Sequence, residues 1–258
     1  MRILISKGWN KMIINHSYKL SAFGEFVNIQ PTPENMILLL ETFGEMKLLP
    51  SVYDELSTSN EEIKPIKRLA LLSEDNKERF LIGTTRIDYE IIANEDTDLE
   101  KDKLDNYINR AKEIFSLISD KYKIKFSRLA LNTENYLLQF AEGKVSNFIN
   151  SYNVMEPKFY NGKEKNEFKV HLLTRIDENI NGVAEGININ TNISKSNFHS
   201  KEVENTEGLT VTVDINTLFE NKNQRFSPVE MDDFVKSSFI IWDEIISDLG
   251  EKIECNGK

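Results

Sequence analysis

The sequence has little of what metal and thiol chemistry in proteins needs. Its 258 residues include one cysteine and three histidines. Cys255 stands close to the end of the chain, so no internal disulfide can form and nothing around it is placed to orient a base. His16, His171 and His199 are isolated, without a second ligand at zinc-binding spacing. We therefore expect no bound metal and no cofactor.

Phosphate-binding and nucleophile motifs are also missing. The sequence contains no G-x-G-x-x-G, no G-x-x-x-x-G-K-[ST] and no G-x-S-x-G. An acidic run at 95–105 lacks the glycine and the ligand spacing of a calcium loop, and it is typical of a helix start. These absences predict no nucleotide site and no catalytic centre, and they favour a protein that is not an enzyme.

Long apolar runs are absent as well. The longest, Met36 to Leu40, is far shorter than a segment that crosses a bilayer, and the apolar run at the start is too short for a signal peptide. With a single cysteine, this pattern favours the cytoplasm and no contact with a membrane.

Positive charge is scarce relative to negative charge. The net charge is −10, and residues 200–258 hold 6 Lys and Arg against 13 Asp and Glu. An acidic surface repels nucleic acid at long range, so we expect no direct nucleic-acid binding. We interpret the excess of acidic residues as a means of keeping the protein soluble. The alternative interpretation is a surface that docks a basic partner or mimics nucleic-acid phosphates.

What the sequence does contain is clear secondary-structure patterning near its C-terminus. Leu209, Val211, Val213 and Ile215 alternate with polar residues, which predicts a strand with one buried face. Ser227-Pro228-Val229-Glu230 then forms a capping-box pattern that opens a long amphipathic helix, with Gly250 placed to end it.

The rest of the chain repeats this alternation of strands and helices. We expect strands at 20–30, 68–72, 80–92, 123–131, 168–175 and 186–193, helices at 33–43, 104–118 and 133–152, and a surface loop at 50–65. The order predicts an α+β protein with two antiparallel sheet-and-helix halves packed together. The N-terminal half is 1–152, the connecting loop 153–167, and the C-terminal half, with its long terminal helix, 168–258. The predicted core includes Phe115, Phe234, Trp242 and Ile245.

Charged residues inside the strand patterns are the only candidates for a ligand site. They are Arg86, Asp88, Arg128, Arg175, Asp177 and Asp214, and the first five are the candidates for a ligand site. The i, i+2 spacing puts Arg86 with Asp88, and Arg175 with Asp177, on one sheet face. Ion pairing on an exposed sheet face is the interpretation we prefer, and a site for a small anionic ligand is the alternative.

Two short segments and one hairpin resemble a known group of proteins. Arg128-Leu129-Ala130-Leu131-Asn132, Val213-Asp214-Ile215-Asn216 and the hairpin 68–94 resemble a sporadically distributed, uncharacterised prokaryotic family of about this length, over residues 20–250. That family has no assigned activity or catalytic residues. Its patchy distribution implies accessory or mobile-element genes, including defence loci.

Together these observations favour a non-catalytic protein-binding subunit in such a defence or mobile-element system. One alternative is an enzyme or sensor that binds a small anionic ligand through dispersed Arg and Asp residues. Another is an acidic inhibitor that mimics nucleic acid. A protein partner is expected in the first case, and the oligomeric state is left open.

Overall fold

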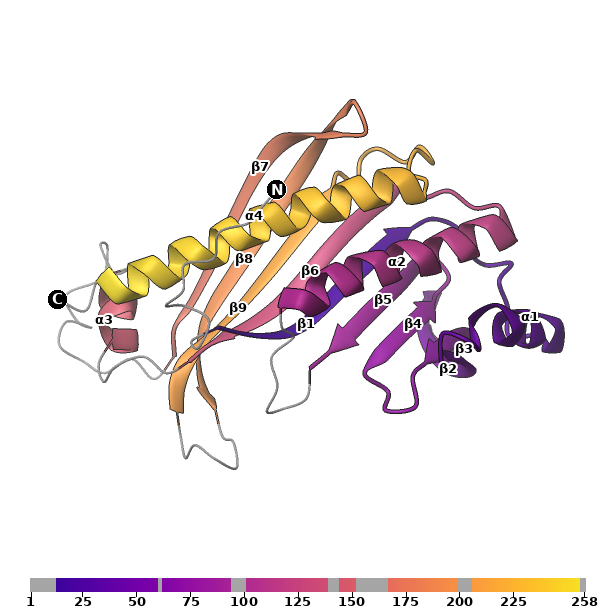
Figure 1. Cartoon of the computed structure of the whole chain (residues 1–258), viewed down its shortest axis with the longest axis horizontal. Helices are drawn as coiled ribbons and strands as arrows, with labels where there is room; N and C mark the ends of the chain where they lie inside the picture. Colours follow the sequence, from indigo (N-terminus) through magenta and orange to yellow (C-terminus); the bar gives the residue numbers. More distant parts are fainter. Residues whose placement is uncertain are drawn as a thin grey trace.

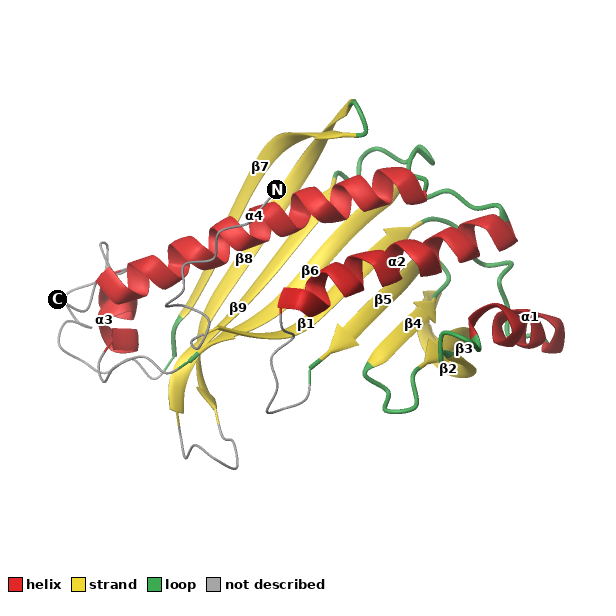
Figure 2. Ribbon diagram, in the orientation of Figure 1, coloured by secondary structure: helices red, strands yellow, loops and turns green. Residues whose placement is uncertain are grey.

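One large antiparallel sheet organises the molecule. The computed structural model describes residues 13–59, 62–93, 101–138, 144–151, 167–198 and 206–255. The sheet has nine strands in the order β2-β3-β4-β5-β1-β6-β9-β8-β7, and α2 and α4 lie across one face of it (Figures 1 and 2). The strands are β1 (Ile13–Phe23), β2 (Leu49–Ser59), β3 (Glu62–Leu72), β4 (Glu78–Ile82), β5 (Arg86–Ile92), β6 (Arg128–Leu137), β7 (Lys169–Ile180), β8 (Val183–Phe198) and β9 (Thr206–Thr217). The helices are α1 (Pro33–Phe43), α2 (Lys101–Tyr122), α3 (Lys144–Ser151) and α4 (Pro228–Cys255).

Alternation along the strands gives the sheet two different faces. In the central strand β1, Tyr18, Leu20 and Ala22 are buried toward the helices. Lys19 and Ser21 therefore point to the opposite face, because successive side chains of a strand alternate. We call this second face the open face, since none of the helices described lies on it (Figure 2).

Two of the helices, α1 and α4, begin where the sequence predicts. Thr32 caps α1 by accepting a bond from the backbone N–H of Asn35 at 3.3 Å, and Pro33 takes the first helical position. Ser227 and Glu230 form the predicted capping box of α4, with Ser227 N donating to Glu230 Oε2 at 2.9 Å. However, α4 does not end at Gly250 but runs on to Cys255. None of the helices described has both the length and the apolar character that crossing a bilayer requires.

The core lies between the sheet and its helix layer. Phe115, Phe234 and Trp242 are buried as predicted, whereas Ile245 is only partly buried. An aromatic cluster joins the two long helices to the central strand: Tyr18 lies 5.6 Å from Tyr107 of α2 and 5.2 Å from Phe239 of α4, between ring centroids.

The structure confirms the α+β class, as one sheet of nine strands, and it corrects several elements. Residues 50–59 and 62–65 are not a loop but belong to the strands β2 and β3, and Thr133 does not cap a helix but is buried in β6. The strand predicted at 20–30 ends at Phe23. The division into two halves stays a prediction, since the connecting loop at 153–167 lies, except for Glu167, outside the described residues.

Candidate functional site

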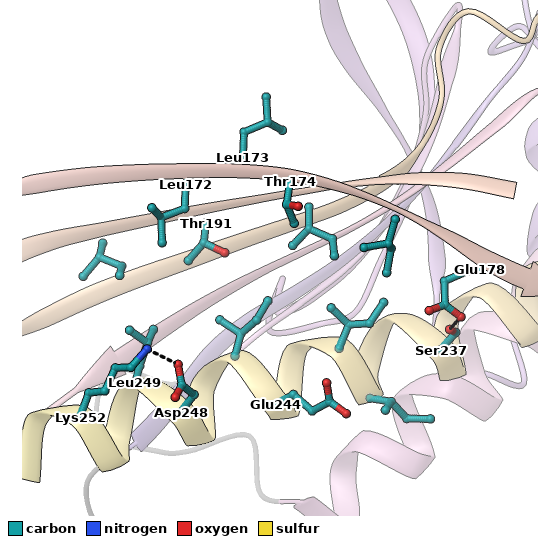
Figure 3. Close-up of a pocket in the computed structure, with 16 residues that line it drawn as sticks. Leu172, Leu173, Thr174, Glu178, Thr191, Ser237, Glu244, Asp248, Leu249 and Lys252 are labelled. Atoms are coloured by element: carbon teal, nitrogen blue, oxygen red, sulfur yellow. Dashed lines mark hydrogen bonds and ion pairs between the residues drawn. The ribbon is translucent and has the colours of Figure 1, made fainter. Parts of the chain in front are cut away.

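A groove opens on the helix side of the sheet, between α4 and the outer strands β7 and β8 (Figure 3). Its volume is about 740 Å³. The lining side chains come from the two strands and from one flank of α4, and most are aliphatic. They are Leu172, Thr174, Ile176, Glu178, Ile189, Thr191, Ile193, Ser237, Ile240, Ile241, Glu244, Ile245, Asp248, Leu249 and Lys252. Leu173 borders the groove from β7, but its side chain points away from α4 (Figure 3).

Strand and helix periodicity together produce this lining. In β8, isoleucine and threonine alternate with asparagine, so Ile189, Thr191 and Ile193 form the floor while the asparagines occupy the open face. The deepest stripe of α4 packs on the core. Ile240 and Ile241 lie on its flank toward the groove, and Ile240 is 42% exposed. The floor residues are themselves buried, and the apolar side chains exposed at the groove are Leu172 and Ile240.

The groove is closed at one end by hydrogen bonds between α4 and the β7–β8 hairpin. Ser237 Oγ donates to Glu178 Oε2 at 3.0 Å, as Figure 3 shows. The hairpin turn is held in the same region, because Asn181 N donates to Asp233 Oδ2 at 2.8 Å. These bonds fix the relative position of the helix and the strands at this end.

The wall formed by α4 is strongly acidic. The helix carries eight Asp and Glu residues against two Lys. Asp248 is neutralised by Lys252 at 2.7 Å, one turn along the helix. Glu244 lines the groove, and within the described residues it has no hydrogen-bond or ion-pair partner. The groove thus combines an apolar floor with an uncompensated carboxylate on its rim.

The five predicted ligand candidates all lie on the open face, away from this groove. Arg86 Nε and Asp88 Oδ2 form the predicted same-face ion pair at 2.8 Å. Ser21 Oγ donates to Asp88 Oδ1 at 2.6 Å, so this largely buried carboxylate has a donor on each oxygen. A buried carboxylate whose two oxygens both accept hydrogen bonds is typical of an ion pair with a structural role.

Arg128 joins this group from β6. Phe23 of β1 lies opposite Arg86 of β5 on one side and opposite Arg128 of β6 on the other. The guanidinium of Arg128 lies 4.5 Å from the Phe23 ring centroid. Arg128 also donates to the Asn216 side chain at 3.0 Å. Burial lowers the pKa of Arg128, while the nearby Asp214 favours its charged form.

Asp214 lies in the middle of the open face, between Asn132 and Asn190 on the neighbouring strands. Burial raises the pKa of its carboxyl group, and the hydrogen bond from Asn216 partly opposes this shift. Its Oδ1 has no hydrogen-bond partner among the described residues.

Arg175 and Asp177 lie apart from the other three candidates, on the edge strand β7. The cross-strand row from Asp88 to Arg175 passes over four intervening strands, so the two positions are roughly 24 Å apart. Arg175 Nε donates to Asn188 Oδ1 at 2.9 Å. The structure therefore brings together Arg86, Asp88 and Arg128, and leaves Arg175 and Asp177 elsewhere.

Comparison with known protein families, with curated proteins and with solved structures finds no match. Within the described residues, no group of three or more His, Cys, Asp or Glu side chains is arranged to hold a metal ion. The function of the chain is therefore inferred from its own geometry.

Sequence reasoning missed the groove. One signal was present: the isoleucines at 240, 241 and 245 make the apolar stripe of α4 wider than a stripe that only faces the core. A second signal was the alternation of Val170, Leu172 and Ile176 in β7. Neither shows that a groove remains between these elements, because that depends on where the other helices lie.

Proposed function

We propose that this chain is a non-catalytic protein-binding subunit, and that the groove between α4 and β7 receives its partner. The observation that carries the proposal is an apolar groove of about 740 Å³ bounded by an exposed helix flank and an edge strand. Apolar grooves of this kind are the usual receptors for amphipathic helices. The family resemblance supports a setting in a prokaryotic defence or mobile-element system.

The geometry favours a helix as the partner segment. In a two-layer protein, helices lie side by side on a sheet at about 8–10 Å, and the groove is the position next to α4 in that layer. An incoming helix would place apolar residues against Leu172 and Ile240, which are 48% and 42% exposed. Glu244 and the acidity of α4 favour a partner with Lys or Arg beside its apolar stripe.

The test is affinity purification at native expression level, followed by mass spectrometry, with variants of the groove. Ile240→Glu introduces a charge on the groove wall at a side chain that is 42% exposed, so we expect the variant to fold. Ile37→Glu is the matched control, because Ile37 is also a helical isoleucine, is 57% exposed and lies on α1.

A stoichiometric partner that is lost with Ile240→Glu and kept with Ile37→Glu supports the proposal. Equal capture by both variants contradicts the groove as the binding site. A captured nucleic-acid enzyme released by moderate salt would instead support an acidic inhibitor that mimics nucleic acid, because such a contact is electrostatic.

A second candidate function rests on the open face. Arg86 and Arg128 flank Phe23 in one cross-strand row, which is an arrangement that a small anionic ligand with a flat group could contact. In this alternative the chain is a sensor or an enzyme. A melting temperature raised by several degrees with one phosphate- or carboxylate-bearing metabolite, and not raised in Arg86→Gln, would favour it over the first proposal.

A further inference from the structure

The outer edge of β7 is the least protected part of the sheet. This strand has twelve residues, contains neither proline nor glycine, and pairs with β8 without a bulge over its whole length. No strand in the described parts of the chain pairs with its other side. The opposite edge strand, β2, carries Pro50 and packs beside α1. Proline and a covering element are the usual means by which proteins block a sheet edge.

We propose that β7 pairs with β7 of a second copy of this chain, antiparallel and about a twofold axis at Leu173. The nine-stranded sheets of two molecules would then continue into each other. A twofold axis normal to a sheet keeps each side chain on its own face, so the residues that meet can be read directly from the sequence of the strand.

On the open face this register sets Leu173 against the partner's Leu173, Lys169 against the partner's Asp177, and His171 against the partner's Arg175. Leu173, which is 66% exposed in the isolated chain, faces the partner's Leu173. Lys169 faces the partner's Asp177, and the symmetry makes this opposite-charge pair twice. Lys169 and Asp177 are both exposed in one copy.

Neighbouring registers are less favourable. An axis at Leu172 places Lys169 opposite Arg175, which are like charges, and an axis at Thr174 places Leu173 opposite Arg175. An axis at Ile176 pairs Arg175 with Asp177, but it sets Leu173 against Asn179. Only the axis at Leu173 pairs the exposed leucine with an apolar side chain and also pairs Lys169 with an acid.

The helix side of the strand fits the same arrangement. Val170 would lie opposite the partner's Ile176, and Leu172 opposite the partner's Thr174. Leu172 and Ile176 line the groove in one copy, so pairing would join the floors of two grooves into one apolar surface. The dimer leaves Ile240 on the helix wall free, so dimerisation and binding of a partner in the groove can be tested separately.

The experiment is sedimentation velocity over a concentration series, on the full chain and three variants: Lys169→Asp, Asp177→Lys and the double exchange. We expect a dimer for the unmodified chain, a dissociation constant raised about tenfold or more in each single variant, and recovery in the double variant, where the charges are exchanged. The matched control is the exchange of Lys67 and Asp54, a cross-strand pair at 2.8 Å near the other edge, which should leave the dissociation constant unchanged.

A monomer at every concentration overturns the proposal. So does a double variant that stays as weak as the single ones. If Lys169→Asp has no effect while Asp177→Lys weakens the dimer, the axis at Leu173 is wrong and the register at Ile176 replaces it.

Discussion

Arg68 shows how one buried residue positions several segments. Its side chain is almost fully buried, and it donates to the carbonyl oxygens of Phe26 and Gly83 at 2.6 Å each and of Ile82 at 3.3 Å. Glu55, 3.7 Å away, supplies the counter-charge. An arginine within a strand can therefore be part of the framework, and a sequence pattern does not separate this role from ligand binding.

The capping glutamate of α4 makes the stability of the molecule depend on pH. The hydrogen bond with the Ser227 side chain is the main reason why the pKa of Glu230 falls from 4.5 to about 2. Because the folded pKa lies below the unfolded one, this stabilisation is complete above pH 4.5 and is lost as the pH falls toward 2.

We therefore expect Glu230→Gln to lower the free energy of unfolding by about 1 kcal/mol at pH 7 and to flatten its decline at acidic pH. Urea unfolding at neutral pH and at two acidic pH values measures both effects. Glu251→Gln, at an exposed position on the same helix, is the control. The prediction fails if the two variants follow the same pH profile.

At the scale of elements, the starts of α1 and α4 were predictable and the edge strand β2 was not. The cap at Thr32 and the capping box at Ser227 are local signals within a few residues. Pro50 and Pro65 are typical of a loop in the sequence, but Pro50 lies on the edge strand, and β4 pairs only with Leu69–Leu72, beyond Pro65. Proline lacks a backbone N–H, and no hydrogen bond is lost where no neighbouring strand would accept from that N–H.

The same distinction holds for the candidate sites. The pairing of Arg86 with Asp88 follows from i, i+2 spacing, and the structure confirms that contact. The approach of Arg128 to Phe23 depends on the register between β1 and β6, which are far apart in the sequence. The groove depends on the absence of a described helix over β8 and β7, and no local pattern carries that information.

The turn between β7 and β8 provides a test at this scale. Asn181 and Gly182 both have positive φ angles, 49° and 83°, as in the two-residue turns that join twisted strands. A Cβ added at Gly182 would have no atom within 4 Å, so Gly182→Ala tests backbone conformation alone.

We expect Gly182→Ala to cost about 1–2 kcal/mol, measured by chemical denaturation. Val183→Ala, at the next and 59% exposed position, is the control and should cost less. An unchanged midpoint for Gly182→Ala would show that the turn is not held in this conformation in solution.

At the scale of the whole molecule, the first and last parts of the described chain share one core. Phe239 and Trp242 of α4 lie 5.2 and 5.9 Å from the ring centroid of Tyr18 in β1. Lys112 of α2 and Asp232 of α4 form an ion pair at 2.8 Å. A division at residues 153–167 would separate β6 from β9, to which it is hydrogen-bonded.

We therefore expect one cooperative unfolding transition, although the chain is longer than most two-state domains. Differential scanning calorimetry should give equal calorimetric and van't Hoff enthalpies. Two resolved transitions, or independent folding of the fragment 1–152, would contradict the shared core.

The strand order also has a consequence for synthesis on the ribosome. β1 to β5 can pair with one another as they emerge, but β6 gains its second neighbour, β9, only after α3, β7 and β8 have been made. During that interval the strand that later occupies the middle of the sheet is a bare edge, and its apolar face awaits α4. Until β9 has been made, the nascent chain thus presents β6 as an unpaired edge, and a ribosome-associated chaperone that shields this edge would reduce the risk of aggregation.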